Sequence, residues 1–168
     1  FGLGPRINAS GRMGSPENAF KILITENEIE AQNLAQILDD GNRDRQKVEA
    51  AAFQEALDAI ETENMASTDQ VLVLGSPDWH EGILGIVASR LVERYQRPSI
   101  VMALKNDSAK GSGRAIPNFS LFESVNKCGE LLTKFGGHAQ ALGLTMKPEN
   151  IAPFRNKLNK IVLEDMKS

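Results

Sequence analysis

Two short runs decide the fold: QVLVLG at residues 70–75 and PSIVMAL at residues 98–104. Both are apolar, contain β-branched residues and have the length typical of buried strands. Between them, residues 78–95 carry apolar side chains at helical spacing. Two strands joined by a helix of this length form a crossover, so we predict that the strands lie parallel in one sheet.

The rest of the C-terminal part continues the alternation of strands and helices. Residues 110–116 and 141–147 are predicted strands, and residues 121–134 and 151–166 are predicted helices. The fold class is therefore α/β, with a mixed β-sheet flanked by helices.

A long helical segment is predicted upstream, over residues 25–66. Thr25 and Glu28 form a capping-box pattern, and apolar residues then recur at helical spacing. Gly41 leaves two possibilities open, a helix pair or one continuous helix. The polar, acidic composition suits a connector between two bodies. Residues 1–15 hold four glycines and are predicted to form a loop. Because the sequence pattern changes near residues 25 and 67, the expected divisions are 1–24, 25–66 and 67–168.

Composition restricts the class of protein. The 168 residues are 41% hydrophobic, which is enough for a real core, and no apolar run is long enough to cross a membrane. The start lacks the profile of a secretory signal, and because residue 1 is Phe we expect a fragment of a longer protein. Cys128 is the single cysteine, which excludes an internal disulfide and favours a reducing, cytoplasmic location.

The charge is unevenly distributed along the chain. The net charge is −3, but eleven acidic and three basic residues fall within residues 25–66, so the rest of the chain sums to +5. That excess could form an anion-binding surface, although a modest excess of Lys and Arg is more often a solvated face.

Two glycine-rich segments contain arginines. Residues 4–14 hold Arg6 and Arg12, and residues 110–114, KGSGR, hold Ser112 and Arg114. Glycines allow the backbone to approach an anion, and guanidinium groups match phosphate oxygens, so both segments are candidate phosphate sites. The alternatives are a flexible end for the first segment and a hairpin or bulge with a surface arginine for the second.

Two further segments contain histidine. Gly136, Gly137 and His138 are expected in a loop that could hold an anionic substrate, although paired glycines also commonly end helices. In residues 79–88, glycines are expected to let a helix pack close to the sheet, and Trp79 is expected to be a lid or a core residue. His80 and Glu81 lack the spacing of a zinc site.

The sequence shows no pattern for hydrolysis by itself. Nothing resembles an Asp and His cluster for two divalent ions, a Ser-His-Asp set or a phosphate-binding loop of the Walker type. We therefore expect no catalytic residue, no metal ligand and no cofactor in this chain.

In this order, the four segments resemble the C-terminal half of the catalytic core of RecJ exonucleases, members of the DHH phosphoesterase superfamily. The pairing of NASGR at residues 8–12 with GSGR and GGH downstream is the specific feature. The resemblance identifies residues 1–24 as the tail of a missing DHH domain, residues 25–66 as a connecting helix and residues 67–168 as a DHHA1 domain. The chain departs from the family pattern at Ser10, Ala115 and Leu142, where Ala, Ser and a small residue are expected.

The resemblance implies a 5′-to-3′ exonuclease acting on single-stranded DNA in recombination and repair. It implies Mn²⁺ or Mg²⁺ bound by the absent DHH domain, and it suggests single-strand-binding protein and recombination proteins as partners, with no membrane. Binding of the DNA 5′ end would be carried by Arg12, Ser112, Arg114 and the loop of Gly136, Gly137 and His138, with Arg6 a weaker candidate.

Other functions stay open. One is a DHH/DHHA1 phosphodiesterase acting on nano-RNA or cyclic dinucleotides; the KGSGR segment and the long connecting helix favour the exonuclease. Another is a non-catalytic nucleic-acid-binding module, like the tail of alanyl-tRNA synthetases. A plain structural α/β domain would leave the four segments apart in space.

Overall fold

The computed structural model of the protein describes residues 2–165. Its compact units divide after Ala51. The first unit contains α1 (Leu3–Met13), α2 (Glu17–Ile24) and the first part of α3 (Glu28–Thr62). The predicted divisions at residues 24 and 66 stay predictions.

The second unit alternates helices and strands. After the last part of α3 it contains, in order, α4 (Met65–Thr68), β1 (Leu72–Ser76), the 3₁₀ turn η1 (Glu81–Ile83), α5 (Leu84–Tyr95), β2 (Ser99–Lys105), β3 (Ser108–Arg114), α6 (Leu121–Asn126), η2 (Gly129–Leu131), β4 (Lys134–His138), β5 (Ala141–Met146), η3 (Pro148–Asn150) and α7 (Ile151–Asp165). The last residue of the predicted final helix, Met166, lies outside the described residues.

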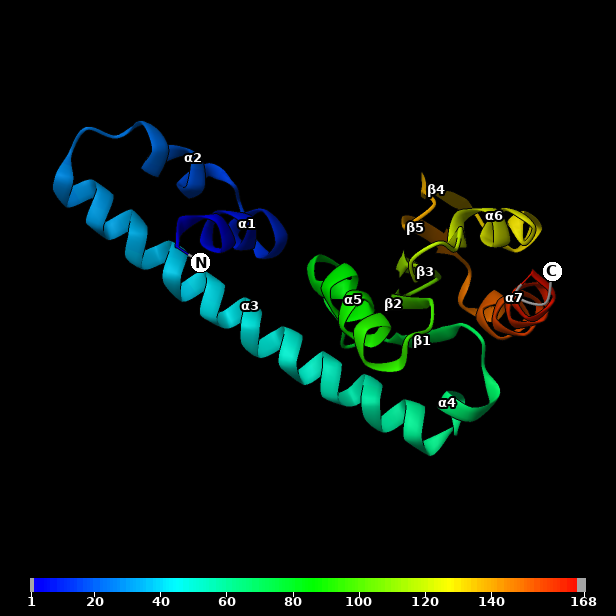
Figure 1. Ribbon diagram of the computed structural model, residues 1–168. Coiled ribbons are helices and arrows are strands. Elements are labelled where there is room, and N and C mark those ends of the chain that lie inside the picture. Colours follow the sequence, from blue (N-terminus) through cyan, green and yellow to red (C-terminus); the bar gives the residue numbers. More distant parts are fainter. Residues whose placement is uncertain (1, 166–168) are drawn as a thin grey trace. The chain divides into compact units, whose positions relative to one another are not determined.

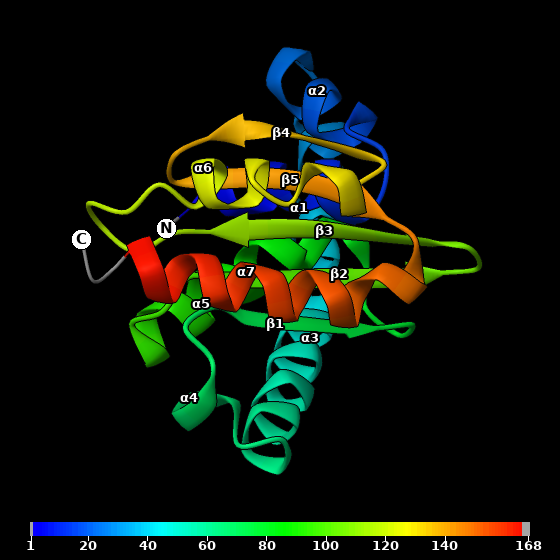
Figure 2. The ribbon, with the colours of Figure 1, turned by 90° about the vertical axis from the view of Figure 1, so that its right-hand side faces the viewer.

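The five strands form one mixed sheet in the order β1-β2-β3-β5-β4. β1 and β2 are parallel and joined through α5, as the crossover pattern predicts, and the remaining neighbours are antiparallel. Figure 1 shows α5 on one side of the strands and α6 and α7 on the other, and Figure 2 shows the latter two helices in front of the sheet. The predicted α/β class, with helices flanking a mixed sheet, is confirmed.

The main core lies between the sheet and the two C-terminal helices. Its buried residues come from alternate positions of the strands and from one face of α6 and α7, for example Ile100, Leu144, Val125, Phe154 and Leu158. The apolar positions of α7 recur every three or four residues, which is why this helix buries one stripe.

The prediction of a loop over residues 1–15 is wrong, because residues 3–13 form α1. The buried apolar residues of the first unit are Ala9, Ala19, Leu34 and Leu38. Packing of this small core offsets the low helix propensity of the two glycines inside α1, each of which costs roughly 1 kcal/mol.

The long connecting helix is a single unbroken helix, α3, of 35 residues (Figure 1). Its first backbone N–H groups are capped by Asn27, whose side-chain oxygen accepts from the N–H groups of Ile29 at 3.0 Å and Glu30 at 3.1 Å. The expected capping box at Thr25 and Glu28 is therefore replaced by an Asn cap two residues later.

The predicted helix over residues 121–134 is shorter than expected. α6 ends at Asn126, η2 follows, and the residues after η2 form β4. Phe135 then packs its ring 5.7 Å from that of Phe122. The expected glycine-rich loop at residues 136–138 is therefore part of an edge strand.

Replacing Gly41 by Ala is expected to stabilise the protein by about 1 kcal/mol, because this glycine lies inside α3 and a Cβ there meets nothing within 4 Å. Urea unfolding followed by circular dichroism measures the change. The reverse substitution at an exposed position of the same helix, Ala50→Gly, is the matched control and should destabilise by a similar amount. A lower stability for Gly41→Ala would contradict the assignment of one continuous helix.

Candidate functional site

The strands β3, β5 and β4 present two different faces, because successive side chains of a strand point to opposite sides. One face is apolar and buried under α6 and α7, with Leu142, Leu144 and Met146 at its centre. The other face, called the polar face below, comprises Lys110, Ser112 and Arg114 on β3, Ala141, Gly143 and Thr145 on β5, and Lys134, Gly136 and His138 on β4.

The pairing register arranges these nine residues in three rows across the strands. Arg114 pairs with Ala141, which pairs with His138. The next row is Ser112, Gly143 and Gly136, and the third is Lys110, Thr145 and Lys134. Successive rows are about 7 Å apart, since a strand advances about 3.4 Å per residue. The register thus places Ser112, Arg114 and His138 on one face of one sheet.

Ser112 and Arg114 form a preordered pair at the end of β3. Nη1 of Arg114 donates to Oγ of Ser112 at 3.0 Å and to the carbonyl oxygen of Gly113 at 2.7 Å. Both side chains are partly buried. A guanidinium held in this way loses little side-chain entropy when it binds an anion.

Gly85, in the first turn of α5, makes room for this pair. A Cβ at Gly85 would lie 2.5 Å from Nη2 of Arg114 and 3.2 Å from Oγ of Ser112. The close packing expected of this glycine is therefore packing against the two side chains rather than against the strand backbone alone. The first turn of α5 also carries the positive end of a helix dipole, which favours an anion beside it.

His138 ends β4 in the same row as Arg114. Its side chain is exposed, and its Nδ1 accepts a hydrogen bond of 3.4 Å from the backbone N–H of Gln140. The preceding Gly137 has φ +145°, and a Cβ there would lie 2.4 Å from the carbonyl oxygen of Ala141, so only glycine fits. Gly137 thus sets the backbone conformation of β4 immediately before His138.

A shallow cavity of about 320 Å³ lies on the polar face. Its lining includes Gly136, Gly143 and Thr145, with Lys110 and Lys134 among its residues. Lys110 also forms a 2.6 Å ion pair with Glu81 of η1. The hydrogen bond from Lys110 lowers the pKa of Glu81, so this carboxylate stays charged at neutral pH.

Four of these residues were missed by the sequence reasoning: Gly85 as a neighbour of Arg114, and Lys134, Thr145 and Glu81. The alternation of KFGGH at residues 134–138 could have placed Lys134 on the same face as Gly136 and His138, if the segment had been assigned to a strand.

Arg6 and Arg12 lie on α1, in the other compact unit. Arg6 forms an ion pair of 2.5 Å with Asp39 of α3, which also pairs with Arg43 at 2.8 Å. Arg12 is exposed. Within its unit, Arg6 thus joins two helices.

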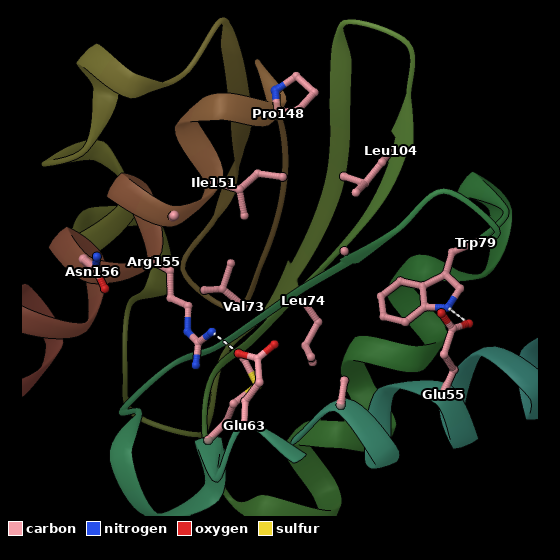
Figure 3. A pocket seen from close by; sticks show the side chains of 14 residues that line it. Glu55, Glu63, Val73, Leu74, Trp79, Leu104, Pro148, Ile151, Arg155 and Asn156 are labelled. Atoms are coloured by element: carbon pink, nitrogen blue, oxygen red, sulfur yellow. Dashed lines mark hydrogen bonds and ion pairs between the residues drawn. The ribbon is translucent and has the colours of Figure 1, made fainter. Parts of the chain in front are cut away.

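A larger cavity, of about 410 Å³, lies beside β1 (Figure 3). Its polar groups are engaged with one another: Trp79, which is buried, donates from Nε1 to Glu55 at 2.7 Å, and Arg155 pairs with Glu63 at 2.5 Å and Asp69 at 2.6 Å. Burial lowers the pKa of Arg155, but its hydrogen bonds to the two carboxylates outweigh that effect and raise it. Because Glu55 and Glu63 line this cavity and its Arg155 is already paired with carboxylates, the cavity is a poor site for an anion.

Residues 2–165 contain no recognisable metal site and no helix that could span a membrane. No group of three or more His, Cys, Asp or Glu side chains in this range is arranged to hold a metal ion. His80 is occupied structurally, because its Nδ1 accepts from the N–H of Gly82 at 3.0 Å. None of the helices described has the length and apolar character needed to cross a membrane.

Comparison with known families identifies the second unit. The pattern of the DHHA1 domain matches residues 68–164. The chain belongs to the DHHA1 domain family. Within that domain, the polar face is formed by β3, β5 and β4.

Similar proteins extend the likeness to the residues before the DHHA1 domain. The chain is 40% identical over 163 residues to the single-stranded-DNA-specific exonuclease RecJ of Bacillus subtilis and 36% identical to that of Escherichia coli. These matches cover 96% and 98% of this chain but 20% and 30% of the relatives. The chain therefore spans less than a third of the length of these relatives.

A solved structure agrees with this likeness. The crystal structure of RecJ from Thermus thermophilus in complex with Mg²⁺ matches 96% of this chain and 25% of that protein, with a TM-score of 0.85 and 32% sequence identity. The similarity thus extends over nearly the whole of this chain, which corresponds to a quarter of that protein.

Replacing Gly85 by Ala is expected to displace the guanidinium of Arg114 without unfolding the domain, because the closest clash is with the end of a flexible side chain. Binding of inorganic phosphate, measured by calorimetry, should weaken several-fold while the melting temperature changes little. Gly129→Ala, where a Cβ would come no closer than 3.9 Å to a neighbouring atom, is the matched control. Unchanged phosphate binding by Gly85→Ala would argue against a role for the Ser112 and Arg114 pair.

Proposed function

We propose that this chain is the end-binding part of a 5′-to-3′ single-stranded-DNA exonuclease of the RecJ type. The observation that supports the proposal most directly is the polar face, where Ser112, Arg114 and His138 converge from β3 and β4. The similarity to RecJ proteins over nearly the whole chain supports the choice of substrate class.

The chemistry of the pair suits a terminal phosphate. A phosphate monoester carries a charge of about −1.5 to −2 at neutral pH, whereas an internal phosphodiester carries one charge. A preordered guanidinium beside a hydroxyl and a helix N-terminus therefore favours an end over an internal position. Preference for the 5′ end then sets the direction of digestion.

His138 lies across β5 from Arg114 and would face the phosphate that follows the bound end. The exposed imidazole can donate a hydrogen bond to a phosphate oxygen without any rearrangement of the strand. Gly136 and Gly137 keep the surface beside it free of side chains. We assign this group to positioning of the strand, because it offers hydrogen-bond donors and a bare surface beside the bound end.

Hydrolysis would need a second domain. RecJ structures have been solved with Mg²⁺ and with Mn²⁺, and we place the corresponding metal ligands in a DHH domain outside this sequence. Divalent ions there would stabilise charge on the reacting phosphate. Arg12 is proposed to contact the strand from α1, and Arg6 is a weaker candidate because it is paired with Asp39.

The cellular setting follows from the same proposal. An exonuclease of this kind would act in DNA repair and recombination in the cytoplasm, with single-strand-binding protein and recombination proteins as partners. The buried, unpaired Cys128 fits a reducing compartment.

In the longer exonuclease, Arg114→Ala is expected to reduce the preference for 5′-phosphorylated over unphosphorylated single strands by about 1–3 kcal/mol, the scale of one charged hydrogen bond. Competition between the two substrates in a cleavage assay measures the ratio. Arg94→Ala, at the opposite end of α5, removes the same charge and should leave the ratio unchanged. Equal loss on both substrates would count against the end-binding role.

The chain by itself is expected to bind single-stranded oligonucleotides weakly, with affinity falling as salt rises, and to show no manganese-dependent cleavage. Fluorescence anisotropy and gel analysis of the purified chain test both statements. Turnover by clean protein would mean that the catalytic centre has been misplaced. A preference for very short RNA or for cyclic dinucleotides would favour the other class of phosphodiesterase.

A further inference from the structure

The polar face extends beyond the end-binding pair. The row of Lys110, Thr145 and Lys134 lies two rows from Arg114 and His138, a distance of about 13 Å along the strands. Consecutive phosphates of an extended strand are closer together than this. A strand whose end lies at Arg114 and that follows the sheet would therefore bring an internal phosphate to the lysine row.

The lysine row carries excess positive charge. The side chain of Lys134 forms no ion pair or hydrogen bond with another residue in the described range, and Glu81 is shared by Lys110 at 2.6 Å and Lys105 at 3.7 Å. Two lysines thus share one carboxylate, and Lys134 adds a further positive charge to the row. Lys105 and Lys110 are about 60% exposed, and exposed ion pairs contribute little, so a phosphate can compete with Glu81 for them.

The middle of the polar face, called the glycine floor below, has exposed backbone at Gly136 and Gly143. Gly136 and Gly143 oppose each other directly, and neither has a positive φ. A Cβ at Gly136 would meet nothing within 4 Å, and one at Gly143 only the carbonyl oxygen of Gly111 at 3.9 Å. Packing inside the chain therefore does not require glycine at either position, although glycine weakens a strand.

We propose that Lys110, Thr145 and Lys134 form a second phosphate subsite, which binds an internal phosphodiester of the strand whose 5′ end lies at Ser112 and Arg114. The 320 Å³ cavity beside the lysines and the two glycines receives part of the strand between the bound end and this internal phosphate. The hydroxyl of Thr145 and the two ammonium groups supply donors to the phosphate oxygens. This subsite rests on the proposed function and extends it from the end of the strand to its interior.

The subsite is tested by binding to the 168-residue chain of two probes with a 5′ phosphate, a mononucleotide and a 3′-labelled single strand. The mononucleotide reaches only Ser112 and Arg114, whereas the strand reaches both subsites. The double substitution Lys110→Ala with Lys134→Ala should weaken strand binding about tenfold or more and leave mononucleotide binding unchanged. The slope of log K against log salt should fall by about 0.7 for each phosphate that the lysines no longer neutralise.

A matched control removes the same charge from the other layer of the domain. Lys127→Ala with Lys160→Ala changes two exposed lysines on the side of α6 and α7. An equal loss of strand affinity in this control would overturn the subsite, because it would reveal only a general charge effect. An equal loss of mononucleotide binding in the Lys110 and Lys134 variant would also overturn it, since the lysines would then belong to the end-binding site.

Two single substitutions probe the floor and the carboxylate separately. Gly136→Val places a side chain in open space, so the domain should fold normally, but strand binding should fall. Glu81→Gln removes the competitor of Lys110 and should raise strand affinity several-fold. Unchanged strand binding in both variants would contradict the proposed path across the sheet.

The two proposals fail in different ways. If strand affinity depends on Lys110 and Lys134 while the 5′ phosphate has no effect, the end-binding function is wrong and the lysine row stands as a backbone contact. If the 5′ phosphate matters but the lysine variant behaves like its control, the second subsite is wrong. If the chain binds no strand at low salt, the subsite is overturned, and the cleavage ratio of the Arg114 variant still decides the end-binding function.

Discussion

Burial of alternate side chains of β5 under α6 and α7 is the constraint on which the polar face depends. Leu142, Leu144 and Met146 are almost completely inaccessible, and the residues between them point the other way. A shift of one residue in the register would send the apolar set to the opposite face, at the cost of the core. The same constraint also fixes which face the side chains of β3 and β4 point to, because both strands pair with β5. Formation of the core thus aligns Arg114 with His138.

Glycines serve two distinct purposes in this domain. At Gly111, Gly113 and Gly137 a Cβ would come within about 3.1 Å of neighbouring atoms, so packing or backbone conformation demands glycine there. At Gly136 and Gly143 a Cβ would have room, so packing within the chain does not require glycine there and the sheet surface is left bare. Leu142, the departure from the family pattern beside His138, points into the core and leaves this surface unchanged.

The strands and the crossover were predictable because each is a short, uniformly apolar run with clear ends. α1 and β4 were not, since both are rich in glycine and each depends on pairing with another element: Arg6 of α1 pairs with Asp39 of α3, and β4 pairs with the next strand, β5. The sequence motifs named Ser112, Arg114 and His138 as candidates. Lys134 and Thr145 emerge only from the pairing register, because they lie far from the KGSGR segment in sequence and beside it in the sheet.

Net charge is a poor guide to this surface. The chain carries −3 overall, yet its acidic side chains on the second unit are largely committed to partners: Asp69 and Glu63 to Arg155, Asp165 to Lys127, and Glu130 to Lys157. Glu81 is the carboxylate that contacts the lysine row. The acids of α6 and α7 lie on the far side of the sheet, whereas the polar face itself carries Lys110, Arg114 and Lys134. A surface built in this way attracts phosphate through local charge and needs no basic protein overall.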